Sequence, residues 1–293
     1  MGDHHHHKAE GNLRAAFLIN LLFTVIEIIG GIYTNSLAIL SDAVHDLGDS
    51  LSLGLALYFQ KLGKKERNEA YSYGYRRFPV LGALINASVL ITGSTVLLVE
   101  AVPALFNPRV TNPEGMFILA IFGVAFNFVA YLKIHRGTSL NEKVVSLHLL
   151  EDVLGWVAVL LGSLVMIFWD LPFIDPLLSV LISTYVIYNA VRSLIKGMKI
   201  FLQGTPDDIQ IKFIRSTVLE LEEVVNVHDC HVWTMDGEHN ILSMHVICDK
   251  NYSLEEQSSI KLKIKELLQG LRILHCTIEF EIEGEGSGQA NKH

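Results

Sequence analysis

The sequence predicts a polytopic α-helical membrane protein that ends in a small α+β domain. Half of the 293 residues are hydrophobic and only 18% are charged, which is too apolar for an ordinary soluble protein. Six apolar runs precede Gln203, and each could cross about 30 Å of hydrocarbon. We expect a His-rich cytoplasmic tail at 1–12, a membrane domain at 13–202, a cytoplasmic domain at 203–283 and a disordered tail at 284–293.

The apolar runs are expected to form six transmembrane helices with both chain ends in the cytoplasm. They are Leu13–Tyr33, Leu37–Phe59, Val80–Val102, Met116–Leu132, Val144–Trp169 and Ile174–Leu194. Loops on one side of the predicted membrane carry Lys61, Lys64, Lys65, Arg67, Arg76, Arg77, Lys133, Arg136, Lys143, Arg192, Lys196 and Lys199. The opposite loops carry only Arg109. Because lysine and arginine accumulate in cytoplasmic loops, this asymmetry sets the orientation.

The last third of the chain predicts the order α-β-β-α-β, with both helices on one face of a sheet. A helix is expected to begin at Pro206, with acidic residues in its first turn, and Ser253 opens a capping box for a second helix. Asp236-Gly237 is a hairpin signal between two runs rich in β-branched residues. The expected elements are a helix to Glu222, strands Val227–Met235 and Ile241–Cys248, a helix to Gln269 and a strand Ile273–Ile282.

Two apolar runs carry the same short pattern, His-x-x-x-Asp. It occurs as His45 with Asp49 in the second run and as His148 with Asp152 in the fifth. Residues four apart lie on one face of a helix, so two facing helices would bring two imidazoles and two carboxylates together. This tetrahedral set suits Zn²⁺ or a related divalent metal, which also neutralises carboxylates that are costly inside a membrane. The pattern predicts a membrane transporter of metal ions.

Several other classes of function fit the sequence less well. The mild net charge of −8 argues against a nucleic-acid partner. Three cysteines, Cys230, Cys248 and Cys276, are too few for a disulfide framework. Four protein ligands leave no open position for a reactive water, and no predicted helix contains His-Glu-x-x-His, so we expect no enzyme. A membrane-anchored zinc sensor is the alternative from another class, and a metal-dependent membrane enzyme comes third.

Protons are expected to compete with metal at the four-ligand site. Metal ligands must be deprotonated, and an empty site would take protons back to avoid bare buried carboxylates. One site that binds either metal or protons is the minimum that antiport needs. Other polar side chains in the runs are expected to bond between helices: Asn20, Glu27, Asn86 and Asn127. The tract His4–His7 is either a passive tail or tag, or a collector of metal.

With these motifs the sequence resembles the cation diffusion facilitator family of metal/proton antiporters. The resemblance includes residues 35–43, Tyr73-Gly74-Tyr75-Arg76-Arg77, Asp175-Pro176 and Gln203-Gly204-Thr205-Pro206. It implies a homodimer with a metallochaperone-like αββαβ cytoplasmic domain, and transport ligands at His45, Asp49, His148 and Asp152. Histidine at the first position of both motifs is typical of zinc-preferring members, with cadmium or cobalt as further substrates. The bilayer, divalent metals and protons are the other partners that it implies.

The sequence also departs from the family's patterns. Tyr71 and Tyr75 stand where some relatives bind a second metal through histidines, so that site is expected to be absent. The resemblance places cytoplasmic metal ligands at His228, His245 and Glu281, with His231, His275, Cys276 and Glu279 nearby, but this mixture matches no complete family pattern. Metal ligands and ordinary surface histidines are both open readings there.

Two further expectations come from the resemblance. Arg77 and Asp207 resemble an ion pair between membrane and cytoplasmic domains. The loop between the fourth and fifth runs is short and not His-rich, and this compactness favours a bacterial inner membrane.

Overall fold

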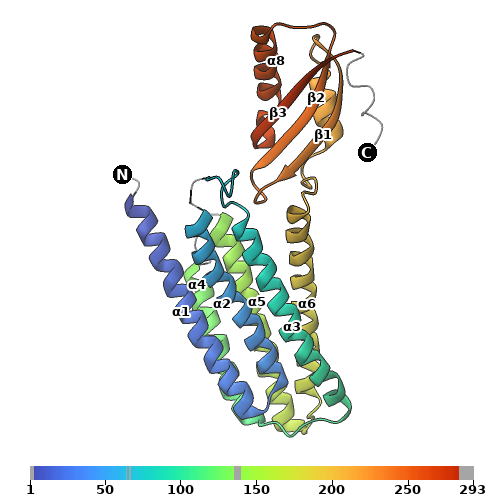
Figure 1. Ribbon diagram of the computed structural model, residues 1–293. Helices are drawn as coiled ribbons and strands as arrows, with labels where there is room; N and C mark the ends of the chain where they lie inside the picture. Colours follow the sequence, from blue (N-terminus) through green and yellow to red (C-terminus); the bar gives the residue numbers. More distant parts are fainter. Residues whose placement is uncertain (1–2, 64, 66, 135–139, 284–293) are drawn as a thin grey trace. The chain divides into compact units, whose positions relative to one another are not determined.

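The computed structural model describes residues 3–63, 65, 67–134 and 140–283; side chains are described from residue 17 onward, except at 56, 57, 60, 63, 133, 134 and 140–148. The chain divides into two compact units. The helical unit extends to Leu194 and leaves out the segment Leu62–Leu81. The sheet unit contains Leu62–Leu81 together with the chain from Ile195 onward. Figure 1 colours both units along the sequence.

Long helices account for most of the helical unit (Figure 1). They are α1 Asp3–Thr34, α2 Leu37–Gly63, α3 Phe78–Phe106, α4 Pro113–Ile134, α5 Leu140–Trp169 and α6 Ile174–Phe201. Each of the apolar runs expected from the sequence lies within one of these helices. The fold class predicted for this part of the chain is therefore confirmed.

Five of the described helices are long and apolar enough to cross a membrane: the segments are Phe17–Thr34, Phe78–Phe106, Pro113–Leu132, Leu149–Trp169 and Ile174–Phe201. Helix α2 has the length but carries Asp42, Asp46 and Asp49 within its first four turns. Helix α2 is thus not among the segments that length and composition identify as spans in the described part of the chain.

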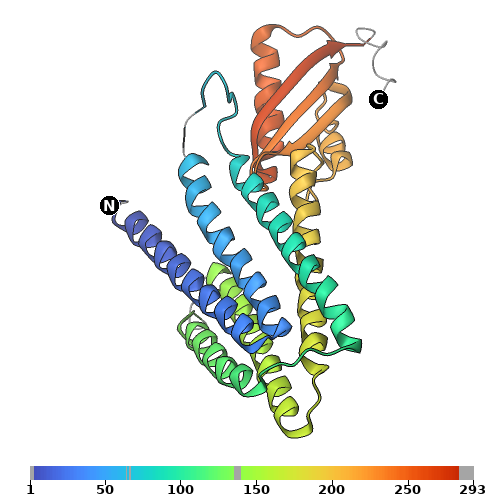
Figure 2. The ribbon, with the colours of Figure 1, turned by 60° about the horizontal axis from the view of Figure 1, so that its bottom comes forward.

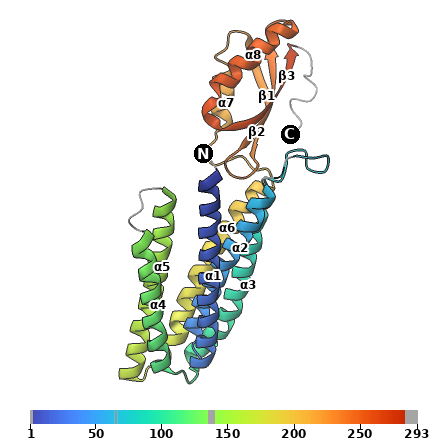
Figure 3. The ribbon, with the colours of Figure 1, turned by 90° about the vertical axis from the view of Figure 1, so that its left-hand side faces the viewer.

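A core of large apolar side chains holds α1, α2, α4 and α5 together. Trp156 of α5 is 1% exposed and its ring meets the ring of Phe23 of α1 edge to face, with centroids 6.0 Å apart. A Cβ atom at Gly123 of α4 would lie 2.1 Å from the Trp156 ring, so only glycine allows α4 to approach α5 this closely. Figure 3 shows α4 and α5 side by side.

The sheet unit contains a three-stranded sheet with both of its α-helices on one face (Figure 3). The elements are α7 Ile211–Val218, β1 Val224–Thr234, β2 Asn240–Cys248, α8 Leu254–Leu267, a 3₁₀ turn Gln269–Leu271 and β3 Ile273–Ile282. Strand β1 is antiparallel to β2, and β2 is parallel to β3; Figure 2 shows the three strands from a second direction. This is the predicted α-β-β-α-β order.

Local chemistry explains where the helices of this unit begin and end. The capping box at Ser253 is present as predicted, because its side chain accepts from Glu256 N and its N–H donates to the Glu256 carboxylate. The expected helix from Pro206 to Glu222 is wrong in its bounds. Residues 206–209 form a turn, and Gln210 is extended with φ −103° and ψ 116°, so α7 starts only at Ile211.

Candidate metal centre

The start of α2 is held by a buried carboxylate from α6. Asp175 is 1% exposed, and its side chain accepts hydrogen bonds from Ser36 Oγ at 2.5 Å, Leu37 N at 2.9 Å and Ala38 N at 3.2 Å. The free N–H groups at a helix start favour negative charge, so this carboxylate stabilises the first turn of α2. Asp175 was expected only as part of the family resemblance, and its contact with α2 was not predicted.

Small hydroxyl side chains continue this contact between α2 and α6. Ser41 Oγ lies 2.7 Å from Ser179 Oγ, and Ser183 Oγ donates to Ser41 Oγ at 3.2 Å. All three serines are buried. Small residues let two helix backbones approach closely, and the hydrogen bonds fix which turns face each other. The His-x-x-x-Asp motif of α2 begins one turn after Ser41.

Three of the four predicted transport ligands come together between α2 and α5. His45 Nε2 lies 3.6 Å from Asp152 Oδ1 and 3.9 Å from Asp49 Oδ2. One potential ligand atom from each of the three residues lies within 4.8 Å of the others. The side chains of His45, Asp49 and Asp152 are 19%, 27% and 10% exposed, so the cluster is largely withdrawn from the molecular surface. We call these three residues the helix trio.

The fourth predicted ligand is described only by its backbone. His148 lies in α5, four residues before Asp152, and its side chain falls outside the described residues. Helical spacing places it on the same face of α5 as Asp152. Asp152 Oδ1 is buried and has no hydrogen-bond partner among the described residues. The same oxygen lies 3.6 Å from His45 Nε2.

Further acidic side chains lie close to the helix trio. Asp42 and Asp46 of α2 are each 5% exposed, and Glu27 of α1 is 1% exposed. Neither carboxylate oxygen of Glu27 has a hydrogen-bond partner in the part of the chain that the structure describes. Asp42 Oδ1 lies 3.6 Å from the position of a Cβ at Gly155, which shows how closely α2 approaches α5 here.

The predicted interhelical role of asparagines holds for two of them. Asn20 of α1 donates to Asp46 O at 3.1 Å and to Ser50 Oγ at 3.0 Å, both in α2. Asn86 of α3 donates to Ser52 Oγ of α2 at 3.4 Å. Asn127 instead donates to Gly123 O within its own helix. A side chain in a helix can always turn back to a carbonyl one turn earlier, and the sequence does not separate these outcomes.

A second cluster lies on the sheet and contains the predicted cytoplasmic ligands. His228, His245 and Glu281 come from β1, β2 and β3, and one potential ligand atom from each lies within 4.8 Å of the others. Glu281 contacts both histidines, with Oε2 2.9 Å from His228 Nε2 and Oε1 2.5 Å from His245 Nδ1. We call these three residues the sheet trio.

Electrostatics within the sheet trio follow from the shared carboxylate. The hydrogen bond with Glu281 raises the pKa of His245 above its ordinary value of 6.5, against a smaller opposing effect of burial. The same bond lowers the pKa of Glu281, and its bond to His228 acts in the same direction. Of the neighbouring candidates, Glu279 Oε2 lies 3.6 Å from His245 Nε2.

The other candidates near the sheet trio make different contacts. The His231 ring lies 4.0 Å from the Asp229 carboxylate, and the His275 ring meets Tyr73 edge to face. Cys276 is half-buried and packs against the core under the sheet. Burial raises its pKa, so this thiol is not activated as a thiolate ligand.

Of two expectations about the segment before α3, the ion pair of Arg77 with Asp207 is wrong, and the absence of a metal site at Tyr71 and Tyr75 stays a prediction. Asp207 pairs with Lys199, Oδ1 to Nζ at 2.5 Å, rather than with Arg77, and this hydrogen bond lowers the pKa of Asp207. Arg77 instead lines a cavity within the sheet unit. The rings of Tyr71 and Tyr75, which stand in the place of possible metal-binding histidines, contact each other with centroids 4.6 Å apart.

Comparison with known families covers nearly the whole chain. Residues 13–202 match the family described as cation efflux transmembrane domain. Residues 206–283 match the family described as cation efflux protein, cytoplasmic domain. The two matches meet just after the end of α6 at Phe201.

Individual relatives match over almost their full length. The cadmium, cobalt and zinc/H(+)-K(+) antiporter of Bacillus subtilis (strain 168) is 34% identical, covering 97% of this chain and 94% of the relative. Zinc transporter ZitB of Pectobacterium atrosepticum is 32% identical, covering 97% and 90%. The metal cation efflux system protein CzcD of Cupriavidus metallidurans is 30% identical, covering 100% and 94%.

These matches agree with the arrangement of the helices and the sheet. Cation efflux proteins are transporters and not enzymes, and the apolar helices make this chain a multi-pass membrane protein. The chain belongs to the cation efflux family, the cation diffusion facilitators that its paired motifs resemble.

Proposed function

We propose that this protein is a proton-coupled transporter that exports zinc from the cytoplasm, with cadmium and cobalt as further substrates. The transport ligands are His45, Asp49, His148 and Asp152. The observation that carries the proposal is the helix trio, in which ligand atoms from two facing helices converge. His148, four residues before Asp152, supplies the fourth ligand by helical spacing.

The spacing of the helix trio supports ligation of a small divalent ion. Zinc binds imidazole nitrogen and carboxylate oxygen at about 2.0–2.2 Å, so two ligand atoms on a zinc tetrahedron stand roughly 3.3–3.6 Å apart. The separations of 3.6 and 3.9 Å from His45 Nε2 are close to that edge. A shift of a few tenths of an ångström would therefore seat an ion between α2 and α5.

The choice of substrate follows from the ligand types. Two imidazoles and two carboxylates favour zinc, cobalt or cadmium over calcium or magnesium, which prefer oxygen ligands alone. The Bacillus subtilis relative is named for cadmium, cobalt and zinc, and the Pectobacterium atrosepticum relative is named for zinc. These names agree with the group of metals that the donor atoms favour.

Proton coupling follows from the cost of leaving the site empty. Asp49 and Asp152 both lie close to His45 Nε2. Keeping two ionised carboxylates in a membrane interior without a counter-charge costs free energy. Metal binding displaces protons, and metal release lets them return. An inward proton gradient would then drive metal out of the cell. The Bacillus subtilis relative is named as an antiporter, which agrees with this exchange.

We further propose that the protein is a homodimer in a bacterial inner membrane, with both ends in the cytoplasm. The excess of lysine and arginine in the loops before α3, before α5 and after α6 supports this orientation. The match of residues 206–283 to a cytoplasmic domain family supports the division into a tail at 1–12, domains at 13–202 and 203–283, and a tail at 284–293.

The sheet trio is a second candidate site for zinc, in the cytoplasmic domain. Two imidazoles and a carboxylate are suitable ligands. The contact of 2.5 Å between His245 and Glu281 is shorter than a zinc tetrahedron's edge, so binding there must first separate this pair.

Flux measurements in proteoliposomes test the transport proposal. Vesicles with an acidic lumen should accumulate zinc, and a protonophore should abolish the accumulation. Asp49→Asn and Asp152→Asn should bind less zinc and show no accumulation above protein-free vesicles. Zinc uptake that ignores the pH gradient would refute proton coupling, and zinc binding with no flux at all would favour the sensor alternative.

A further inference from the structure

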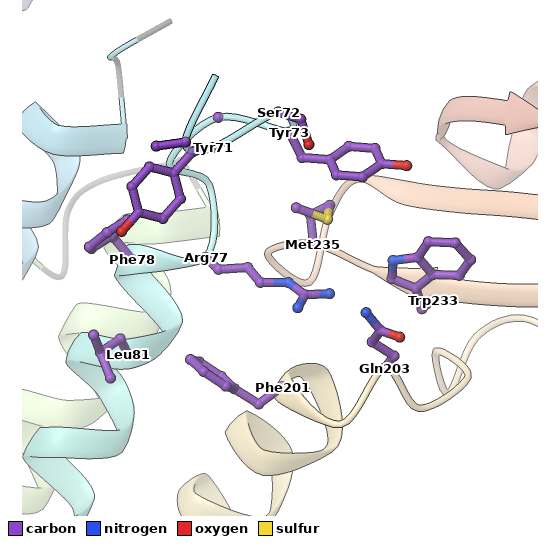
Figure 4. Close-up of a pocket in the computed structure, with 12 residues that line it drawn as sticks. Tyr71, Ser72, Tyr73, Arg77, Phe78, Leu81, Phe201, Gln203, Trp233 and Met235 are labelled. Carbon is purple, nitrogen blue, oxygen red and sulfur yellow. The ribbon is translucent and has the colours of Figure 1, made fainter. Parts of the chain in front are cut away.

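A cavity of about 400 Å³ lies within the sheet unit, apart from both trios. Its walls come from the segment before α3, the first turn of α3, the end of α6 and strand β1, as Figure 4 shows. Phe78, Leu81, Phe201 and Met235 supply apolar surface to the cavity. A cavity of this size is within the range of small-molecule sites, which are commonly apolar with a few polar groups.

One cation extends into this apolar cavity. Figure 4 shows the Arg77 side chain crossing the space between Phe201, Met235 and Gln203. Arg77 Nε is buried and has no hydrogen-bond partner among the described residues. The described lining contains no aspartate or glutamate. A guanidinium beside apolar surface favours an anionic partner, and its planar donors suit phosphate oxygens.

The lining also excludes the transported ion as the occupant. None of the lining residues is a histidine, a cysteine or a carboxylate, and a divalent cation would be repelled by Arg77. The ligand must therefore combine negative charge with apolar surface.

The cavity lies where two membrane-crossing segments meet the cytoplasm. Phe78 begins α3 and Phe201 ends α6, and both residues are the limits of candidate membrane spans. The polar headgroups of a bilayer lie at this level, next to the ends of the hydrocarbon chains. Exposed lysines and arginines accompany Arg77 on the same side: Lys65, Arg67, Lys196 and Lys199. Such basic segments attract the anionic lipids of the cytoplasmic leaflet.

We propose that this cavity binds an anionic phospholipid of the cytoplasmic leaflet, with the phosphodiester on Arg77 and acyl chain against Phe78, Leu81 and Phe201. The site involves neither trio and stands whether or not the transport proposal holds. One bound lipid would contact the start of α3, the end of α6 and β1 at the same time.

Native mass spectrometry of the purified full-length protein tests this site. Dioleoyl phosphatidylglycerol should bind about tenfold more tightly than dioleoyl phosphatidylcholine, because both lipids carry the phosphodiester but only phosphatidylcholine adds a choline cation, which Arg77 repels. Arg77→Gln should remove this preference. Arg67→Gln is the matched control, because Arg67 is exposed in the same segment but does not line the cavity, and it should retain the preference.

Two further arms keep the test decisive. Leu81→Trp, which fills the cavity and leaves Arg77 in place, should also weaken phosphatidylglycerol binding. Glycerol 3-phosphate, the free headgroup, should not displace the lipid. The proposal fails if both lipids bind equally, if Arg67→Gln has the effect of Arg77→Gln, or if glycerol phosphate displaces the lipid. The proposal also fails if the dimer binds no phosphatidylglycerol. That result would indicate that a second subunit covers the cavity.

Discussion

The helix trio and the sheet trio offer similar donor atoms but differ in their internal contacts. In the sheet trio, Glu281 lies at hydrogen-bond distance from both histidines, at 2.9 and 2.5 Å. In the helix trio, His45 Nε2 lies 3.6 and 3.9 Å from the two carboxylates. In the sheet trio the carboxylate and the two histidines are hydrogen-bonded to each other. In the helix trio the distances are close to those between ligand atoms around a bound ion. A count of ligand residues alone would not separate them.

The difference has a physical origin in the backbone that carries each trio. The i, i+4 spacing of a helix sets His45 and Asp49 one turn apart, and helix packing sets the distance to Asp152. Neighbouring strands lie about 4.8 Å apart, so side chains on one face of a sheet touch directly. The Glu281 carboxylate between two histidines therefore forms hydrogen bonds with both of them before any metal is present.

The largest expected effect contrasts one carboxylate from each trio. Asp152→Asn should reduce zinc flux in proteoliposomes by about a hundredfold or more, since loss of even an indirect partner of a metal ligand commonly costs 10–100-fold. Glu281→Gln should leave flux within a few-fold of the wild type. Equal losses from the two variants would show that both trios are needed to move metal, and would contradict the distinction drawn from their geometry.

An intermediate effect concerns stability rather than flux. Glu281→Gln removes the charged acceptor of two histidines, and in chelator-treated protein it should lower the free energy of unfolding of the sheet unit by about 1–2 kcal/mol. Urea unfolding of the full-length protein, followed by tryptophan fluorescence, measures this. A variant as stable as the wild type without metal would mean that the hydrogen bonds at 2.5 and 2.9 Å contribute no net stability.

The smallest expected effect is the loss of stability when a surface ion pair outside the sheet trio is removed. Glu223 Oε1 lies 2.5 Å from Lys263 Nζ, and this bond lowers the pKa of Glu223 below its ordinary value of 4.5. A lowered pKa stabilises the folded state above the unfolded pKa, and this contribution is lost as pH falls through the folded value. Glu223→Gln should therefore cost about 0.5 kcal/mol or less at neutral pH, and nothing in acid.

The control for this small effect is Glu222→Gln, which changes the exposed neighbour of Glu223. Thermal unfolding at neutral and acidic pH, compared between the two variants, measures the difference. A larger loss of stability from Glu223→Gln in acid than at neutral pH would have the wrong sign for this ion pair.

Much of the fold follows from local sequence patterns. The apolar runs predict α1 to α6, and the alternation around Ile273–Ile282 predicts β3 with its observed bounds. The capping box at Ser253 was also readable, because both of its residues lie in one short segment. Features that depend on four or five adjacent residues are the ones that a sequence displays.

Features that depend on distant partners were not predictable in this way. Asp175 accepts hydrogen bonds from backbone groups of α2 that lie 137 and 138 positions away in the sequence. The residues next to Asp175 in the sequence do not predict these partners. The expected pair of Arg77 and Asp207 is replaced by a pair of Lys199 and Asp207, which lie eight residues apart. For the helix trio, the paired motif predicts the residues but not their separations, and His148 remains a prediction.

Diffraction from zinc-soaked crystals at the zinc absorption edge would locate the bound metal. An anomalous peak is expected between α2 and α5, about 2.0–2.2 Å from His45 Nε2 and from carboxylate oxygens of Asp49 and Asp152. Asp152→Asn crystals should lose this peak. Zinc bound at the sheet trio alone, with no peak between α2 and α5 in the wild type, would show that the helix trio is not the metal site.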